Sequence, residues 1–405
     1  MALIVPFRAL RPTPAAAARV AAVPYDVVSV QEAHALADGN PLSFLHVSRA
    51  EIDLPAQTDP YSDAVYRKAV ENFETLKRQA PLVVEDSPSL YVYRLKMGKH
   101  VQTGVAGTFS IDEYQRGVLK KHEHTRPDKE DDRTRHMIEL RAQTGPVFLT
   151  YRTSRTVDRI VNDVMRGSPL FDFAAPDGVQ HSMWRADDAE LRDLVAAFDA
   201  IPSLYIADGH HRAASAARAR QQLRATDGRH CESDTVLAVA FPDSQTQVLP
   251  YNRVVKDLGS YSPASFLAKL REQFDVNEGP ATPSRKGQIS MFLDNRWYTI
   301  DLGQGQRDVR AADRLDVSRL QENMLAPLLG IGDVRSDKRI DFVGGVRGTA
   351  ELEQLVRSGK YAVAFSLYPV SVDDLMQVCD GGGIMPPKST WFEPKLRDGL
   401  LSHLI

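Results

Sequence analysis

The sequence has little cysteine and no excess of one charge, and each absence excludes a class of protein. Cysteine occurs only as Cys231 and Cys379 in 405 residues. Two cysteines exclude a disulfide framework and a cysteine-rich zinc module, and they fit a reducing compartment. Lys and Arg total 50 against 53 Asp and Glu, for a formal net charge of −3. A dedicated nucleic-acid coat usually needs a strong basic excess, so a nucleic-acid partner is not expected.

Long apolar runs are also missing. No segment reaches the roughly 18 consecutive apolar residues that a membrane span requires. The first eight residues, Met1-Ala-Leu-Ile-Val-Pro-Phe-Arg8, carry no basic region ahead of an apolar stretch. We therefore expect a soluble cytoplasmic protein with no membrane partner, and we leave a homo-oligomer open.

The chain is ordinary in composition and too long for one average domain, with 43% hydrophobic and 25% charged residues. Helical and strand-like patterns interleave throughout, which favours a mixed α/β (α+β) fold. We expect an N-terminal α/β region over 1–105, a core over 106–275 that contains a phosphate loop, and a C-terminal α/β region over 288–405. The segment 276–287, rich in Gly and Pro, is the expected linker. We expect these regions to interlock as sub-domains of one body.

The first candidate site is Asp208-Gly-His-His-Arg212, between an apolar strand at 204–207 and an Ala-rich helix at 213–223. A helix start presents free backbone N–H groups to an anion. Gly209 allows close approach of the backbone, and Arg212 can bind phosphate oxygens. Asp208 could hold Mg²⁺, and the two histidines could donate or shuttle protons. The plainer alternative is that Asp208 caps the helix.

The second candidate is Lys121-His-Glu-His-Thr125, followed by Lys129, Arg133 and Arg135. In an extended segment, His122 and His124 share one face and Glu123 takes the other. The His-Glu-x-x-His spacing of zinc proteases is absent, which disfavours a permanent metal site. A solvated charged loop is the alternative.

The third candidate follows three glycines at 381–383. Lys388, Ser389 and Thr390 offer a cation and two hydroxyls, but the Walker A spacing is not met. The alternative is a C-terminal turn anchored by Trp391 and Phe392.

Six ordered motifs across nearly the whole chain together resemble the bacterial family called domain of unknown function 1015 (DUF1015). They are Val23-Pro-Tyr-Asp-Val-Val-Ser29, Asn40-Pro-Leu-Ser-Phe-Leu-His-Val-Ser48, Lys121-His-Glu-His-Thr125, Ala207-Asp-Gly-His-His-Arg212, Lys338-Arg-Ile-Asp-Phe-Val-Gly-Gly345 and Met385-Pro-Pro-Lys-Ser-Thr-Trp-Phe392.

That family is similar to free L-serine kinases of the ParB/sulfiredoxin-like superfamily. The resemblance implies a nucleotide-binding core of that type within a larger body, with ADP or ATP as phosphate donor. It also implies that Asp208 to Arg212 bind nucleotide phosphates and that Glu123 is the general base on a serine hydroxyl. Glu123 and Asp208 are 85 positions apart, further than in those kinases.

Three functions follow as hypotheses: a kinase that converts free L-serine to O-phosphoserine, a non-catalytic nucleotide-binding switch of the ParB-like type, and a metal hydrolase that uses His122, His124, His210 and His211. For the kinase, Mg²⁺ and a nucleotide are the expected cofactors, and a small hydroxylated metabolite is the expected partner. The assigned residues are Glu123, Asp208, His210 and His211 for catalysis; Gly209, His211, Arg212, Lys129 and Arg133 for the nucleotide; His122, His124, Lys388, Ser389 and Thr390 for the substrate; and Asp208 for the metal.

Overall fold

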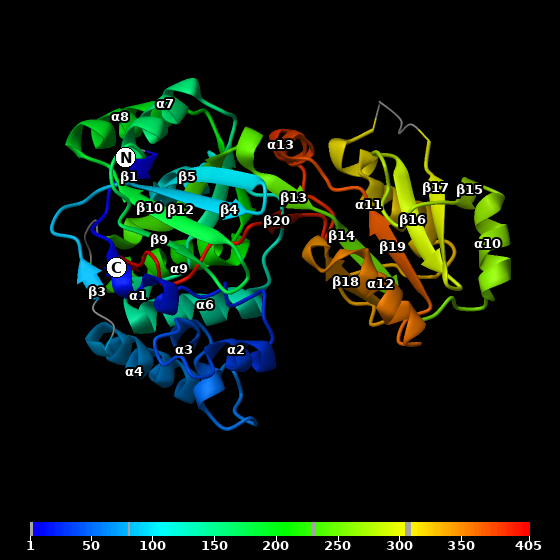
Figure 1. Cartoon of the computed structure of the whole chain (residues 1–405), viewed down its shortest axis with the longest axis horizontal. Helices are drawn as coiled ribbons and strands as arrows, with labels where there is room; N and C mark the ends of the chain where they lie inside the picture. The colour runs from blue at the N-terminus through cyan, green and yellow to red at the C-terminus, as the bar shows by residue number, and fades with distance from the viewer. Residues whose placement is uncertain (1–2, 80–81, 228–231, 304–308) are drawn as a thin grey trace. The chain divides into compact units, whose positions relative to one another are not determined.

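The chain divides into two compact units, each of which is described here by itself (Figure 1). The computed structural model describes residues 3–79, 82–227, 232–303 and 309–405. The first unit contains Met1–Thr246 together with Pro394–Ile405, and the second contains Gln247–Glu393. The chain thus leaves the first unit once and returns to it for its last residues.

This division differs from the three regions expected from the sequence. The segment 276–287, expected as a linker, begins within a strand and lies inside the second unit. Its Gly and Pro residues form a loop between two strands of one sheet. Composition marks a loop equally well whether the loop joins strands or domains. Cys231 lies outside the described residues, and Cys379 is buried.

The first unit is built on a nine-stranded mixed sheet. Its strand order is β6 (Leu119–Lys120), β11 (Leu204–Asp208), β8 (Val147–Tyr151), β12 (Thr235–Pro242), β5 (His100–Ser110), β4 (Tyr91–Met97), β10 (Gln180–Arg185) and β9 (Phe171–Ala174), and β1 (Ile4–Val5) pairs with β5. The pairs β6–β11 and β8–β12 are parallel, and the remaining pairs are antiparallel. Every residue of β8 and β12 is buried, as expected of central strands covered on both faces.

Nine α-helices complete the described part of this unit. They are α1 (Pro14–Val20), α2 (Val30–Ala37), α3 (Leu45–Ser48), α4 (Asp63–Gln79), α5 (Ile111–Gln115), α6 (Pro127–Leu140), α7 (Arg155–Val164), α8 (Asp188–Asp199) and α9 (His210–Asp227), with the short 3₁₀ helix η1 at Ala50–Asp53. In the view of Figure 1, the α7–α8 pair lies above the sheet and the α6–α9 pair below it. Ala213, Ala216 and Ala219 are buried in the main core, so small side chains let α9 pack closely.

The last residues of the chain are part of the first unit's packing. Ala22 and Asp398 exchange both backbone hydrogen bonds, and Ser402 does the same with Leu10. The strand β21 (His403–Leu404) pairs with β7 (Ala142–Gln143), and β2 (Leu10–Pro12) pairs with β3 (Leu82–Val84). The C-terminal segment therefore joins the N-terminal region of the chain to the end of α6.

The second unit contains a six-stranded antiparallel sheet. Its order is β15 (Asp275–Glu278), β17 (Arg296–Asp301), β16 (Gln288–Leu293), β19 (Val363–Leu367), β14 (Tyr251–Val255) and β18 (Ile340–Gly344), and β13 (Gln247–Leu249) pairs separately with β20 (Trp391–Glu393). Its helices are α10 (Pro263–Arg271), α11 (Asp316–Leu320), α12 (Gly348–Arg357) and α13 (Val372–Asp380). Asp294-Asn295 forms the hairpin turn between β16 and β17, with positive φ angles of 48° and 62° that suit a tight two-residue turn. The predicted mixed α/β class is confirmed.

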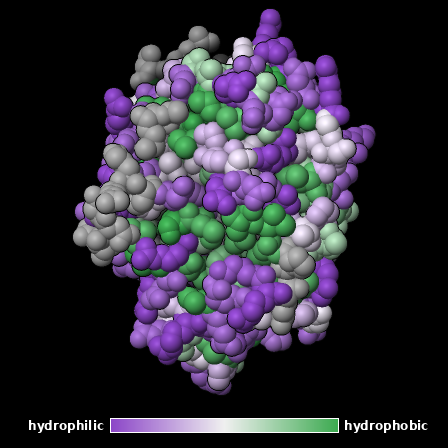
Figure 2. Space-filling model, turned by 90° about the vertical axis from the view of Figure 1, so that its left-hand side faces the viewer, coloured by the Kyte–Doolittle hydropathy of each residue, from purple (hydrophilic) through white to green (hydrophobic). Residues whose placement is uncertain are grey.

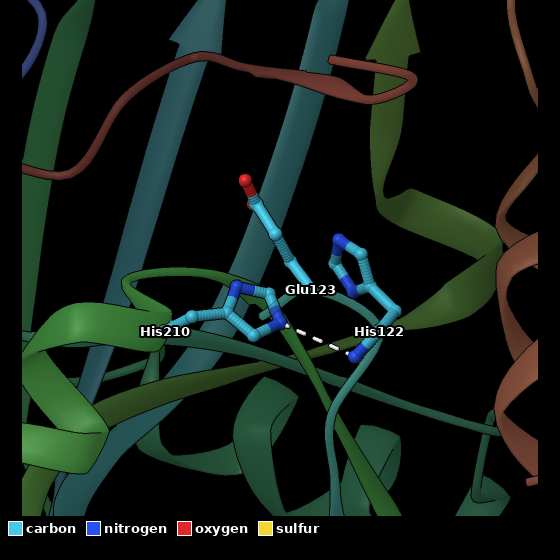
Figure 3. Close-up of side chains that lie close together, drawn as sticks. All are labelled: His122, Glu123 and His210. Atoms are coloured by element: carbon cyan, nitrogen blue, oxygen red, sulfur yellow. Dashed lines mark hydrogen bonds between the residues drawn. The ribbon is translucent and has the colours of Figure 1, made fainter. Parts of the chain in front are cut away.

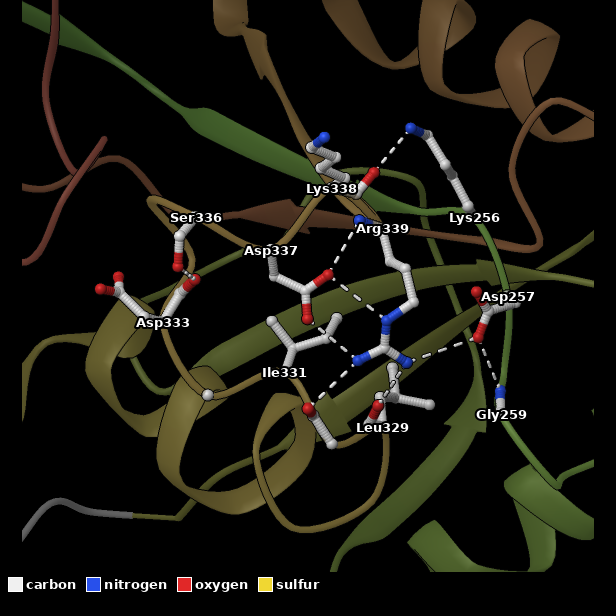
Figure 4. Close-up of polar contacts among 12 residues, drawn as sticks. Lys256, Asp257, Gly259, Leu329, Ile331, Asp333, Ser336, Asp337, Lys338 and Arg339 are labelled. Carbon is white, nitrogen blue, oxygen red and sulfur yellow. Dashed lines mark hydrogen bonds and ion pairs between the residues drawn. The ribbon is translucent and has the colours of Figure 1, made fainter.

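One of the motifs noted in the sequence has a structural role in this unit. The guanidinium of Arg339 donates to the carbonyl oxygens of Leu329 and Gly330 at 3.0 and 3.1 Å, and it pairs with Asp337 at 3.0 Å (Figure 4). Lys256 donates to the carbonyl oxygen of Lys338 at 2.6 Å. Arg339 therefore satisfies carbonyl groups that a helical segment leaves open at its end.

Figure 2 shows hydrophilic side chains over most of the visible face, with hydrophobic side chains gathered near its middle. Within the described ranges, no helix is both long and apolar enough to cross a bilayer.

Substitution of Gly399, which packs against Phe44, tests how much the packing of the C-terminal segment contributes to stability. Gly399 has φ +82°, and a Cβ there would lie 2.5 Å from Cδ2 of Phe44. Gly178 has φ +81°, but no atom lies within 4 Å of its Cβ position. We expect Gly178→Ala to lower the free energy of unfolding by about 1–2 kcal/mol, and Gly399→Ala to lower it by about 1–3 kcal/mol more. Urea unfolding of both variants measures the difference, and equal losses would contradict the packing assigned to Gly399.

Candidate functional site

Two segments far apart in the sequence meet at one edge of the first sheet. β6 and β11 are parallel neighbours, with Leu119 opposite Leu204 and Lys120 opposite Tyr205. Parallel strands end at the same edge, so the residues that follow them lie together. The Lys121–Thr125 and Asp208–Arg212 segments therefore form one site despite the 85 positions between Glu123 and Asp208.

The junction between β11 and α9 requires glycine. Asp208 is the last residue of β11, and His210 is the first residue of α9. Gly209 between them has φ +94°, and a Cβ there would lie 3.0 Å from Cζ of Arg212. The N–H of Gly209 donates to Oδ1 of Asp208 at 3.0 Å. This tight turn exposes the first N–H groups of an 18-residue helix, which is a favourable place for an anion.

Asp208 is held by two cations. Its Oδ2 lies 3.2 Å from Nζ of Lys395 and 3.5 Å from Nη2 of Arg212. Burial alone would raise the pKa of Asp208, but the charges of Lys395 and Arg212 outweigh it and hold that pKa well below its usual value. Asp208 is therefore a fixed carboxylate at neutral pH.

The same contacts bear on the expected magnesium ligand. One oxygen of Asp208 accepts the Gly209 N–H, and the other faces Lys395 and Arg212. A magnesium ion on Oδ2 would have to displace Lys395 and approach Arg212, and on Oδ1 it would share the oxygen with the Gly209 N–H. The arrangement around Asp208 thus does not fit Mg²⁺.

Arg212 is buried, and both of its terminal nitrogens have partners in the protein. Nη1 donates to the carbonyl oxygen of Pro146, and Nη2 lies 3.5 Å from Asp208 and 4.0 Å from Asp26. Burial alone would lower the pKa of Arg212, but Asp26 and Asp208 raise it, so its charge is permanent. Arg212 therefore fixes the loop and supplies positive charge to it, and direct binding of phosphate by Arg212 stays a prediction.

His122 and His210 are in direct contact (Figure 3). Their rings are nearly perpendicular, with centroids 4.3 Å apart. The backbone N–H of His122 donates to Nε2 of His210 at 3.3 Å. Because Nε2 accepts, the neutral His210 ring carries its proton on Nδ1, and Figure 3 shows that nitrogen facing the side on which Glu123 lies.

Both rings are neutral at physiological pH. Burial lowers the pKa of His122 to about 4, against smaller opposing contributions from the Ile206 backbone and Asp208. Burial, followed by the proximity of His122, lowers the pKa of His210 well below 6.5. Neutral imidazoles can donate or accept a proton, and they can also bind a metal.

Glu123 is exposed, whereas His122 and His210 are buried. One ligand atom from each of the three residues lies within 4.8 Å of the others. Sequence reasoning identified all three residues, with Glu123 and His210 assigned to catalysis and His122 to the substrate. The structure brings them together at the end of β6 and the start of α9.

The other predicted residues of the first unit lie around this centre. His211 accepts the backbone N–H of Arg126 at 3.1 Å, and burial lowers its pKa. His124 is exposed.

Lys129 donates to the hydroxyl of Tyr61 at 2.8 Å. Arg133 pairs with Asp132 at 2.8 Å, and its guanidinium lies over the ring of Tyr25. Both contacts are within the first unit and help to hold its fold together.

Lys388, Ser389 and Thr390 belong to the second unit. Lys388 has φ +56°, and its carbonyl oxygen accepts from Nη2 of Arg253 at 3.0 Å. The hydroxyl of Ser389 donates to the carbonyl oxygen of Pro386. These contacts shape a turn, and a substrate role for the three residues stays a prediction.

Sequence reasoning missed Lys395 and Asp398, which the C-terminal segment brings into the site. The Asp398 carboxyl is buried, and a Cβ on Gly145 would lie 2.8 Å from its Oδ1. Burial raises the pKa of Asp398 to about 7, although Arg212 opposes the shift. No motif surrounds Pro394-Lys-Leu-Arg-Asp398 in the sequence, so only the fold could reveal these two residues.

These features define a mixed α/β protein with a polar, histidine-rich site at the end of two parallel strands. The family model described as "Protein of unknown function (DUF1015)" matches residues 4–318. The chain belongs to this family, as its motifs predicted. No curated protein matches the chain.

Solved structures match most of the chain at low similarity. A variant of a free serine kinase in complex with AMP is 13% identical, with a TM-score of 0.36, and the match covers 73% of this chain and 92% of that chain. SbnI from Staphylococcus aureus, truncated at its C-terminus, is 13% identical, with a TM-score of 0.39 and coverage of 74% and 87%. A conserved hypothetical protein from Pyrococcus furiosus is 15% identical, with a TM-score of 0.36 and coverage of 74% and 95%.

The buried carboxyl of Asp398 predicts a specific pH dependence of stability. Its pKa in the folded chain, about 7, exceeds the ordinary value of 3.8. The folded state therefore holds this proton more tightly than the unfolded state, and the contribution of Asp398 to stability falls as the pH rises from 3.8 to about 7. We expect wild type to lose melting temperature relative to Asp398→Asn over this window. A constant difference between the two proteins from pH 5 to 8 would contradict the assigned protonation.

Proposed function

We propose that this protein is a small-molecule kinase that transfers a phosphoryl group from ADP or ATP to a hydroxyl, with free L-serine as the acceptor. One observation carries the proposal: the exposed Glu123 carboxylate lies within 4.8 Å of the ring nitrogens of His122 and His210, at the start of α9. The carboxylate can take the proton of the attacking hydroxyl, and the neutral donors and the helix N-terminus can stabilise the charge on the transferred phosphoryl group. The acceptor and the ParB/sulfiredoxin-like character of the core come from the family resemblance.

The phosphates of the donor would bind at the beginning of α9. The first backbone N–H groups of a helix have no partner within the helix and favour an anion. Lys395 and the buried Arg212 place positive charge near this end, partly offset by Asp208. Neutral His210 would donate from Nδ1 to an oxygen of the transferred group, where negative charge accumulates.

Glu123 would act as the general base. It is exposed at the end of β6 and can reach a hydroxyl that approaches from solvent. In the reaction, the hydroxyl gives its proton to Glu123, and its oxygen forms a bond to the terminal phosphorus of the donor. The bond from that phosphorus to the bridging oxygen breaks, so ATP leaves as ADP, or ADP leaves as AMP.

Replacement of Glu123 by Gln tests this role. We expect Glu123→Gln to reduce phosphoserine formation by about 10²–10⁴-fold, because a positioned base contributes that much. Nucleotide affinity should be unchanged, since the amide keeps the size of the carboxylate. Mass spectrometry quantifies the product and calorimetry measures nucleotide binding.

Glu139→Gln is the matched control, because Glu139 is exposed on α6 and pairs only with Arg135 among the described ion pairs. Full activity in Glu123→Gln would contradict the proposal. If wild type binds nucleotide but phosphorylates neither serine nor other hydroxylated metabolites, the non-catalytic switch is correct instead.

A metal-dependent hydrolase is the second candidate, and the clustering of His122, Glu123 and His210 favours it. Two neutral imidazoles and a carboxylate suit zinc, iron or manganese, and three protein ligands leave positions for water. This set differs from the four-histidine set expected from the sequence, because it contains Glu123 and lacks His124 and His211, and His211 already accepts from Arg126.

Metal analysis of protein purified without a histidine tag decides between the candidates. A hydrolase should carry about one metal ion per chain and lose it in His210→Gln but not in the exposed control His124→Gln. A chain free of zinc, iron and manganese, which still forms phosphoserine, removes the hydrolase.

A further inference from the structure

The second unit contains a cavity of about 410 Å³ that lies within that unit alone. It lies where β19 ends at Leu367, β14 begins at Tyr251 and β16 follows Gly287. Ligand pockets typically measure about 300–1,000 Å³, so the cavity suits a small metabolite.

Four cations line this cavity, and two of them have carboxylate partners. Arg285 pairs with Asp301, and Lys286 pairs with Asp374 at 2.5 Å. Within the described ranges, Arg314 and Arg319 have no carboxylate within ion-pair distance. Arg314 donates to the amide oxygen of Gln377 at 3.3 Å. Arg319 donates to the carbonyl oxygens of Gly303, at 3.0 Å, and Leu302.

The two carboxylates that line the cavity are satisfied by other donors. Both oxygens of Asp316 lie 3.0 Å from the N–H of Gly287. Asp374 accepts the N–H of Ser371 at 2.9 Å in addition to its bond with Lys286. Four cations against two carboxylates give the lining a positive excess, although the charge of Asp316 partly offsets that of Arg319.

Apolar and aromatic residues also line the cavity. Leu367, Tyr368, Pro369 and Val370 follow one another from the end of β19, and Tyr251 begins β14. The ring of Tyr251 packs edge-on against Trp391, with centroids 5.2 Å apart, which fixes its position. Charged groups beside apolar and aromatic side chains can orient a small organic ligand.

From this geometry we propose that the second unit binds a small organic anion, with its carboxylate or phosphate at Arg314 and Arg319 and its apolar part against Tyr251 and Tyr368. This site is separate in sequence and in unit from the His122–Glu123–His210 centre, and it does not depend on the proposed function.

Calorimetric titration of the full chain with AMP, inorganic phosphate and succinate tests the site. We expect at least one probe to bind, and Arg314→Gln to weaken its affinity about 10–100-fold, since a hydrogen bond to a charged group is worth that much. Comparison of the phosphate probes with succinate identifies the anionic group. Gln377→Glu should give the same loss without removing the arginine, because a carboxylate would then neutralise Arg314.

Arg296→Gln is the control, because Arg296 is an exposed arginine of the same unit and does not line the cavity. This substitution should leave the affinity unchanged. Absence of binding by all three probes at millimolar concentration would overturn the proposal. So would unchanged affinity in both Arg314→Gln and Gln377→Glu, which would place the bound probe outside the cavity.

Discussion

The parallel pairing of β6 with β11 is the constraint on which the candidate site depends. The pairs Leu119–Leu204 and Lys120–Tyr205 set the register. Because the strands are parallel, the chain leaves the sheet at the same edge after each of them. Glu123 and His210 then meet without any long-range signal in the sequence. An antiparallel pairing of the same strands would put the two segments at opposite edges of the sheet.

A second constraint is electrostatic. Asp208 keeps its charge in a largely buried place because Lys395 and Arg212 face it. The neighbouring histidines lose their charge for the opposite reason, since burial disfavours a protonated ring more than the nearby carboxylate favours it. The site thus combines a fixed ion-pair network with neutral proton donors and acceptors. Lys395 belongs to this network only because the last residues of the chain pack against the first unit.

The sequence predicted the mixed α/β class, the family and the residues at the centre of the site. These predictions rested on local patterns: a strand followed by Gly209 and an Ala-rich helix, and histidines around Glu123. The contribution of Lys395 and Asp398 could not be predicted, because it depends on the return of the C-terminal segment across about 150 residues of the second unit. The ion pair of Arg133 with Asp132 and the hydrogen bond of Arg212 to Pro146 could not be predicted either, because sequence spacing does not show which group a buried arginine contacts.

An isotope experiment tests most directly whether this centre transfers phosphoryl groups to an alcohol. The protein is incubated with ATP, or ADP, and L-serine in water enriched in ¹⁸O, and the products are analysed by mass spectrometry. The account predicts phosphoserine without ¹⁸O, because the serine hydroxyl supplies the attacking oxygen. Inorganic phosphate that carries ¹⁸O, with no phosphoserine, would show that water is the acceptor and would contradict it.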